Sequence, residues 1–129
     1  MEISKEDNLE KVGLFLRNLN FNDFAVILNN DTIDIKGPLN SPIKTTIKDI
    51  RKDNEKNKNS LTLLMKNINI LFIENNFFKG TFTCFIFNIE ENTTENFMVS
   101  GLNKIFDICD KYLSENSEQY KKFINLHKL

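Results

Sequence analysis

Three strand-like runs follow one another closely in the middle of the chain: LTLLM (61–65), INILFI (68–73) and TFTCFIFNI (81–89). The runs are rich in the aliphatic, β-branched and aromatic residues that fit a pleated, buried surface. The links between them, 66–67 and 74–80, are too short for a crossover connection, so consecutive strands must pair antiparallel. The sequence therefore predicts an antiparallel meander at the centre of the fold.

Before this meander the sequence predicts a helix and a hairpin. Apolar residues recur at helical spacing over 5–19, which indicates an amphipathic helix. A continuous apolar run at 24–28 predicts a buried strand, and an alternating run at 32–36 predicts a half-exposed strand. Asn and Asp fill the segment between them at 29–31, and both residue types tolerate the positive φ values of a tight turn.

A second, short helix is predicted after this hairpin. Ser41 is a suitable N-cap, and Pro42 fits the first helical position. The apolar residues of this helix form one narrow line on an otherwise charged surface: Ile43, Ile47 and Ile50. We therefore expect the helix to cover only part of a sheet face.

A long third helix is predicted after the meander, over 93–113. Asn92 and Glu95 have the spacing of a capping box, in which the two side chains satisfy free backbone N–H groups at a helix start. Apolar residues would then share one helical face: Met98, Leu102, Ile105, Cys109 and Tyr112. The residues at 114–117 break this helix, and a short amphipathic tail follows at 120–126.

Together these segments predict one α+β domain over 1–116 and a helical tail over 117–129. The expected order is helix, two strands, helix, three strands, helix. A chain of 129 residues suits one such core. We expect a five-stranded antiparallel sheet with helices on both of its faces.

The balance of charges excludes several classes of partner. Lys and Arg number 17 and Asp and Glu number 18, so the formal net charge is -1. A protein that binds nucleic acid by neutralising phosphates needs a basic face, which this balance argues against. No apolar run approaches the roughly 20 residues that span a bilayer, and the polar N-terminus does not look like a signal peptide. We therefore expect a cytoplasmic protein that neither inserts into a membrane nor binds nucleic acid.

Residues that commonly carry catalysis are sparse. His127 is the only histidine and lies close to the C-terminus, where a catalytic role is unexpected. Cys84 and Cys109 lie in apolar patterns without a CxxC pair, so we expect buried, inert thiols and no zinc site. Asp107 and Asp110 suit an exposed helix face, and a small acid-based enzyme is the least favoured hypothesis. We expect no catalytic residue, no cofactor and no metal.

The order of elements and two segments resemble the roadblock/light-chain-seven family, which includes dynein-associated light chains and subunits of the lysosomal Ragulator scaffold. The first segment is the predicted hairpin, FAVILNND (24–31). The second is the three-strand meander, followed directly by the acidic turn Glu90-Glu91-Asn92 and a helix over 93–113. The resemblance covers roughly residues 8–115 and is one of architecture, because the family has no catalytic signature.

The resemblance implies a protein-interaction module without enzymatic activity. It implies a homodimer, or a pair with a second roadblock-like subunit, on which a small Ras-like GTPase assembles. The family forms its dimer through the second helix and the strand after it. The corresponding side chains in this sequence are Ile43, Ile47, Ile50, Leu61, Leu63 and Met65.

Phe77 and Phe78 form a further candidate contact site. These adjacent aromatic residues lie in a polar connection between two predicted strands, where both cannot easily point inward. An exposed aromatic side chain often marks an interface. The competing interpretation is a turn that folds back onto the sheet.

Profilin is the alternative family. It shares the plan of a first helix, a hairpin and a terminal helix, and the segment EENTT (90–94) is loosely similar. That resemblance implies a monomeric protein that binds actin monomers. Profilins commonly use a tryptophan to bind polyproline, and this chain has none.

Overall fold

The three runs of the meander form strands β2 (Ser60–Met65), β3 (Ile68–Glu74) and β4 (Thr81–Asn88) in the computed structural model of the chain. The prediction for these strands is confirmed to within one residue at each end. The structure describes most of the chain: residues 9–28, 60–75, 78 and 80–127.

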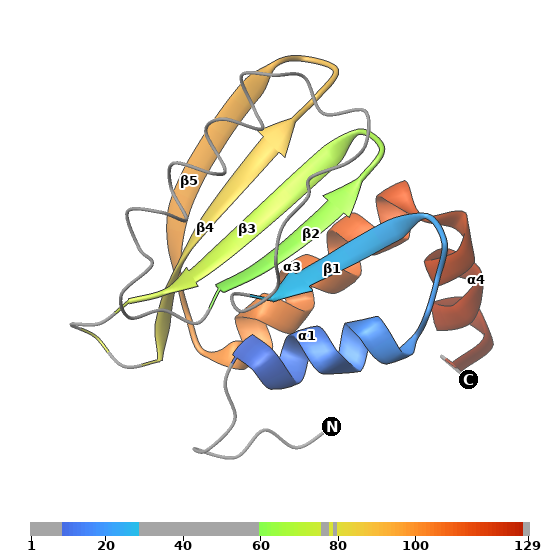
Figure 1. Cartoon of the computed structure of the whole chain (residues 1–129), viewed down its shortest axis with the longest axis horizontal. Coiled ribbons are helices and arrows are strands. Elements are labelled where there is room, and N and C mark those ends of the chain that lie inside the picture. The colour runs from blue at the N-terminus through green and yellow to red at the C-terminus, as the bar shows by residue number, and fades with distance from the viewer. Residues whose placement is uncertain (1–8, 29–59, 76–77, 79, 128–129) are drawn as a thin grey trace.

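Two further strands complete the sheet, β1 (Phe24–Leu28) and β5 (Thr93–Ser100). All neighbouring strands pair antiparallel, and their order across the sheet is β1-β2-β3-β4-β5, as Figure 1 shows. The expected α+β fold with a five-stranded antiparallel sheet is therefore confirmed. The predicted strand at 32–36 and the predicted helix from Ser41 lie outside the described residues.

The helix predicted over 93–113 is wrong in its first half, because Thr93–Ser100 forms β5. Met98 is consequently on a strand and does not belong to a helical face. Two residues with left-handed backbone bound the strand, Asn92 with φ 53° and Gly101 with φ 84°. Helix α3 begins only after Gly101 and spans Leu102–Asn116.

The capping box predicted at Asn92 belongs to a hairpin turn instead. The turn at 89–92 joins β4 to β5, and the backbone N–H of Glu91 donates to the side-chain oxygen of Asn88 at 3.0 Å. Thr93, Thr94 and Val99 in the strand that follows are β-branched, which favours a strand over a helix. Local strand preference and the turn therefore override the helical spacing.

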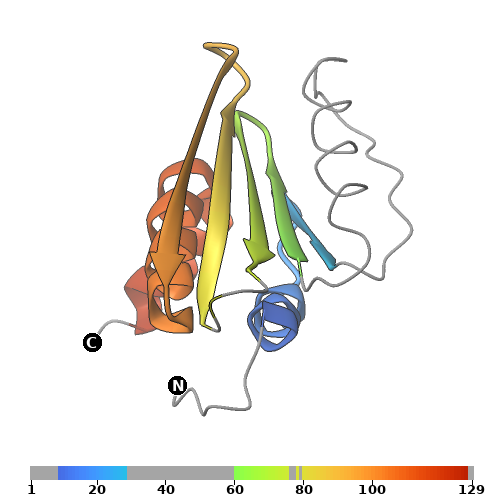
Figure 2. The same ribbon diagram turned by 90° about the vertical axis from the view of Figure 1, so that its left-hand side faces the viewer.

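The described helices pack on one face of the sheet and form the main core. They are α1 (Leu9–Asn18), α3 and α4 (Glu118–His127). Seen from the side, α3 and α4 lie on one side of the strands (Figure 2). The buried helix residues of this core are spaced by three or four: Leu9, Val12 and Leu16 on α1, and Leu102, Ile105, Cys109 and Leu113 on α3. This stripe is what an amphipathic helix presents to a sheet.

The opposite face of the sheet carries a second, smaller apolar cluster. Its buried members are Leu71, Ile73 and Phe87, from β3 and β4. Asn69 of β3 lies fully buried on the same face as Leu71, because side chains alternate along a strand. Helices are thus seen on one face among the described residues, and the expected helix on the other face lies outside them.

The C-terminal tail is a docked helix. Ser117 separates α3 from α4, and its hydroxyl accepts a hydrogen bond from the backbone N–H of Tyr120 at 3.0 Å, as an N-cap does. Tyr120 is only 2% exposed and belongs to the main core. The tail therefore packs on the same core as the preceding elements. Within the described part of the chain, no helix has the length and apolarity to cross a membrane.

Candidate functional site

The side chains that the sequence proposed as a dimer contact lie mostly in the core or outside the described residues. Leu61, Leu63 and Met65 are buried on β2, beneath α1, and β2 has a neighbouring strand on each side. A partner cannot reach these three side chains without opening the core. The isoleucines at 43, 47 and 50 and the phenylalanine at 77 are not among the described residues.

Phe78 is the one proposed contact residue that the structure shows on the surface. Its side chain is 65% exposed in the connection between β3 and β4. The backbone carbonyl of Phe78 accepts hydrogen bonds from the backbone N–H and the hydroxyl of Thr81, at 3.1 and 2.7 Å. This turn holds the ring outward, so Phe78 remains a candidate contact.

The outer edge of β5 is the first surface suited to a partner. Among the described strands β5 pairs only with β4, and seven of its eight residues are exposed. Phe97 is 36% and Met98 is 60% exposed. A strand with one free side offers a row of unpaired backbone N–H and C=O groups. We call this surface the β5 edge.

The β5 edge also has the regularity that strand addition needs. Its pairing with β4 runs without a bulge from Thr81 opposite Ser100 to Asn88 opposite Thr93. The strand contains no proline and no lysine, which are two residues that commonly protect an edge. Glu95 is its only charged residue. Little in this strand opposes a further strand beside it.

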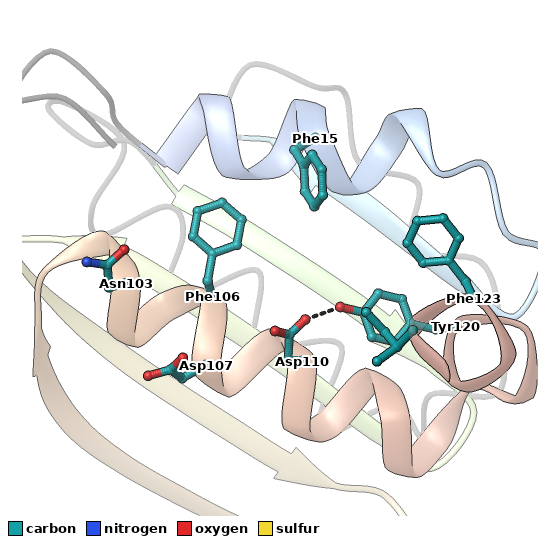
Figure 3. A pocket seen from close by; sticks show the side chains of 8 residues that line it. Phe15, Asn103, Phe106, Asp107, Asp110, Tyr120 and Phe123 are labelled. Atoms are coloured by element: carbon teal, nitrogen blue, oxygen red, sulfur yellow. Dashed lines mark hydrogen bonds between the residues drawn. The ribbon is translucent and has the colours of Figure 1, made fainter. Parts of the chain in front are cut away.

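A groove between α1, α3 and α4 is the second candidate surface. It has a volume of about 360 Å³. Figure 3 shows α1 and α3 side by side, with rings from all three helices directed into the space between them. The lining residues are Phe15, Asn103, Phe106, Asp107, Asp110, Tyr120, Phe123 and Ile124. We call this surface the helix groove.

The helix groove exists because α3 has a second stripe beside the buried one. This stripe occupies positions i, i+3, i+4 and i+7 on the solvent side of the helix, with Phe106 half-buried: Asn103, Phe106, Asp107 and Asp110. Phe15 of α1 meets Phe106 edge to face, with ring centroids 5.9 Å apart. The apolar floor thus comes from aromatic rings at the margin of the core.

A hydrogen bond fixes the polar wall of the helix groove. The hydroxyl of Tyr120 donates to Oδ1 of Asp110, as Figure 3 shows. Burial and, next, this bond to Asp110 raise the pKa of Tyr120. Tyr120 therefore stays protonated at neutral pH and holds the Asp110 carboxylate in one orientation.

The cysteines are not suited to nucleophilic chemistry. Both Cys84 and Cys109 are buried and free. Burial, with a smaller contribution from Glu95, raises the pKa of Cys84 to about 12. Burial likewise raises the pKa of Cys109. Because the thiolate is the reactive form, both thiols are inert at neutral pH.

The described part of the chain contains no cluster of metal-ligating side chains. No group of three or more His, Cys, Asp or Glu side chains there is placed to hold a metal ion. His127 packs against Phe123, with ring centroids 4.4 Å apart. This contact is one of helix packing at the end of α4.

No protein-family model matches the chain, and no curated protein or solved structure matches it significantly. The segments on which the resemblance to the roadblock family is based can be compared with the elements in the structure. The opening helix and first strand are present, and so is the three-strand meander. After the turn at 90–92, however, the structure has strand β5 where the resemblance implies a helix.

Proposed function

We propose that this chain is a protein-interaction module that pairs with a second copy of itself through the β5 edge. One observation carries this proposal: β5 is a regular strand of eight residues with a described neighbour on one side only, and it exposes Phe97 and Met98. Two copies related by a two-fold axis would place the same strand against itself.

Pairing of this kind supplies both hydrogen bonds and apolar contact. The free backbone groups of one β5 would bond to those of the other, as in peptide recognition by strand addition. Phe97 lies opposite Cys84 and Met98 opposite Thr83, so the two exposed side chains project from opposite faces of the sheet. Each copy would therefore contribute apolar contact on both faces of the joint sheet.

The resemblance to the roadblock family suggests a role for such a dimer. A small Ras-like GTPase would bind the assembled pair, and the second subunit could equally be a different roadblock-like chain. This step rests on the sequence resemblance alone. Co-purification of a Ras-like GTPase with the dimer would support this role, provided that the GTPase does not co-purify with a monomeric variant.

Met98→Lys is expected to weaken self-association by at least about tenfold, because it replaces an apolar contact with a hydrated charge on the strand edge, where lysine opposes strand pairing. The measurement is light scattering after gel filtration over a series of concentrations. Leu126→Lys is the matched control, since this leucine is also exposed but lies on α4. Phe78→Lys in the same assay tests whether the turn between β3 and β4, and not the β5 edge, forms the contact.

A wild-type chain that is monomeric at every concentration contradicts the homodimer. The same holds for a dimer that Met98→Lys leaves unchanged. If the chain is monomeric, assays of actin polymerisation test the profilin-like alternative directly, because a protein that sequesters actin monomers slows filament growth.

A further inference from the structure

We propose that the helix groove binds a lysine or arginine side chain presented by a partner polypeptide. This surface is formed by α1, α3 and α4 and does not include β5. The inference therefore adds a second binding site and does not depend on pairing through the β5 edge.

Charge complementarity is the first argument. The lining of the helix groove contains two carboxylates, Asp107 and Asp110, and no lysine or arginine. Lys111 is next to Asp110 in sequence, but its ammonium nitrogen lies 5.3 Å from the centroid of the Tyr112 ring. Both carboxylates are exposed to solvent, so an incoming cation is attracted to them without first losing its whole hydration shell.

The aromatic rings supply the second argument. Phe15, Phe106 and Phe123 line the helix groove from three different helices. Lysine and arginine bury an aliphatic stem against apolar surface while their charged ends stay polar. The charged ends are also attracted to the faces of aromatic rings. A volume of about 360 Å³ lies at the small end of the range for ligand pockets, which suits one long side chain.

The carboxylate of Asp110 is held in place before any ligand arrives. Tyr120 donates its hydroxyl hydrogen to Oδ1 of Asp110, which leaves Oδ2 to accept from a cationic group. Tyr120 is itself buried and anchored in the core. An acceptor that is already oriented loses less conformational freedom on binding.

The exposed aromatic surface in the wall of the helix groove points to a polypeptide as the source of the cation. Phe15 of α1 lines the helix groove and is 40% exposed. A free amine would leave much of the Phe15 ring in water, whereas a partner segment could cover it with apolar residues beside its lysine. An exposed apolar patch with polar residues at its rim is typical of protein interfaces.

The test uses three synthetic helical peptides that carry leucines on one face and differ at one position, which is lysine, norleucine or glutamate. Binding to the full chain is followed by NMR titration. We expect the lysine peptide to bind about fivefold more tightly than the other two. The shifted signals should include those of Phe15, Phe106 and Phe123. The double variant Asp107→Asn/Asp110→Asn should remove this preference.

Glu90→Gln is the matched control, because it removes one exposed carboxylate far from the groove, at the turn between β4 and β5. Asn at position 110 keeps an oxygen that can accept from Tyr120, and urea unfolding checks that the double variant is folded. Its self-association should be unchanged, which separates this proposal from the one on the β5 edge.

Three results would overturn the inference. The three peptides could bind equally, or the preference for lysine could survive in the double variant. Alternatively, n-butylammonium could bind as tightly as the lysine peptide, which would assign the site to a free amine. The inference stands if the preference is present in the wild type and in Glu90→Gln and absent in the double variant.

Discussion

Replacing Tyr120 with alanine is expected to lower the free energy of unfolding by about 3–5 kcal/mol, the range for truncating a large buried aromatic side chain. The side chain of Tyr120 is only 2% exposed and belongs to the main core. It packs against Phe21, Phe24 and Phe123, with centroids 6.2, 6.3 and 6.4 Å away. Truncation leaves a cavity beneath α4 and removes the bond to Asp110. Urea unfolding followed by circular dichroism measures the change.

Leu126→Ala is the control for this prediction. Leu126 lies on the same helix but is 73% exposed, so its truncation should change the free energy of unfolding by less than about 0.5 kcal/mol. Tyr120→Phe keeps the ring and removes only the hydroxyl, and we expect a loss of about 1–2 kcal/mol. Equal stabilities of Tyr120→Ala and Leu126→Ala would show that α4 is not docked as described.

Gly13→Leu is expected to lower the free energy of unfolding by about 1–3 kcal/mol or more, the cost of overpacking a filled core. Gly13 lies where α1 packs closely against β1 and β2. A Cβ atom built there would overlap Cδ2 of Leu28 and would lie 3.1 Å from Cδ1 of Leu61. A leucine side chain would force α1 away from β1 and β2. Thermal or urea unfolding measures the loss.

Two companion variants make the result on Gly13 specific. Gly13→Ala adds one methyl group against the movable end of a leucine and gains about 1 kcal/mol of helix propensity, so its net effect should be small. Leu14→Phe adds volume to α1 at an exposed position and should change little. If Gly13→Leu is as stable as Leu14→Phe, the close approach of α1 to the sheet is wrong.

The strands of the meander could be predicted because their signal is local. Each run at 61–65, 68–73 and 81–89 is apolar and short, and the links leave no choice except antiparallel pairing. The unbroken apolar stretch at 70–73 indicates a strand that is buried on both faces, and β3 is such a strand. No sequence pattern predicted that Asn69, the second residue of this strand, is fully buried.

The error over 93–113 shows how periodicity can mislead. Met98 stands four residues before Leu102, which is helical spacing, although Met98 is on a strand and Leu102 begins a helix. The available signal was the glycine between them, because glycine readily adopts positive φ at a break between elements. Gly101 does so, with φ 84°. The β5 edge was missed for the same reason, since a segment expected to be a helix offers no sheet edge.

The helix groove could not be predicted from the sequence. Phe15, Phe106 and Phe123 belong to three separate helices, and each fits the margin of an amphipathic stripe. Whether such rings close over the core or leave a gap depends on how far apart the helices pack. The available hint was the width of the stripes, because Phe15 stands beside the buried Leu16 and Phe106 beside the buried Ile105.

The order of strands has a consequence for how the chain folds. From β2 to β5 each strand pairs with the next one along the chain, through short turns, whereas β1 must find β2 across the 31 residues of 29–59. Closing a long loop has a larger entropic cost than closing a turn, and distant contacts form more slowly. We therefore expect the β2–β5 meander to form first and the segment of α1 and β1 to add last. In pulse-labelling hydrogen exchange during refolding, amides of β3 and β4 should gain protection before those of β1.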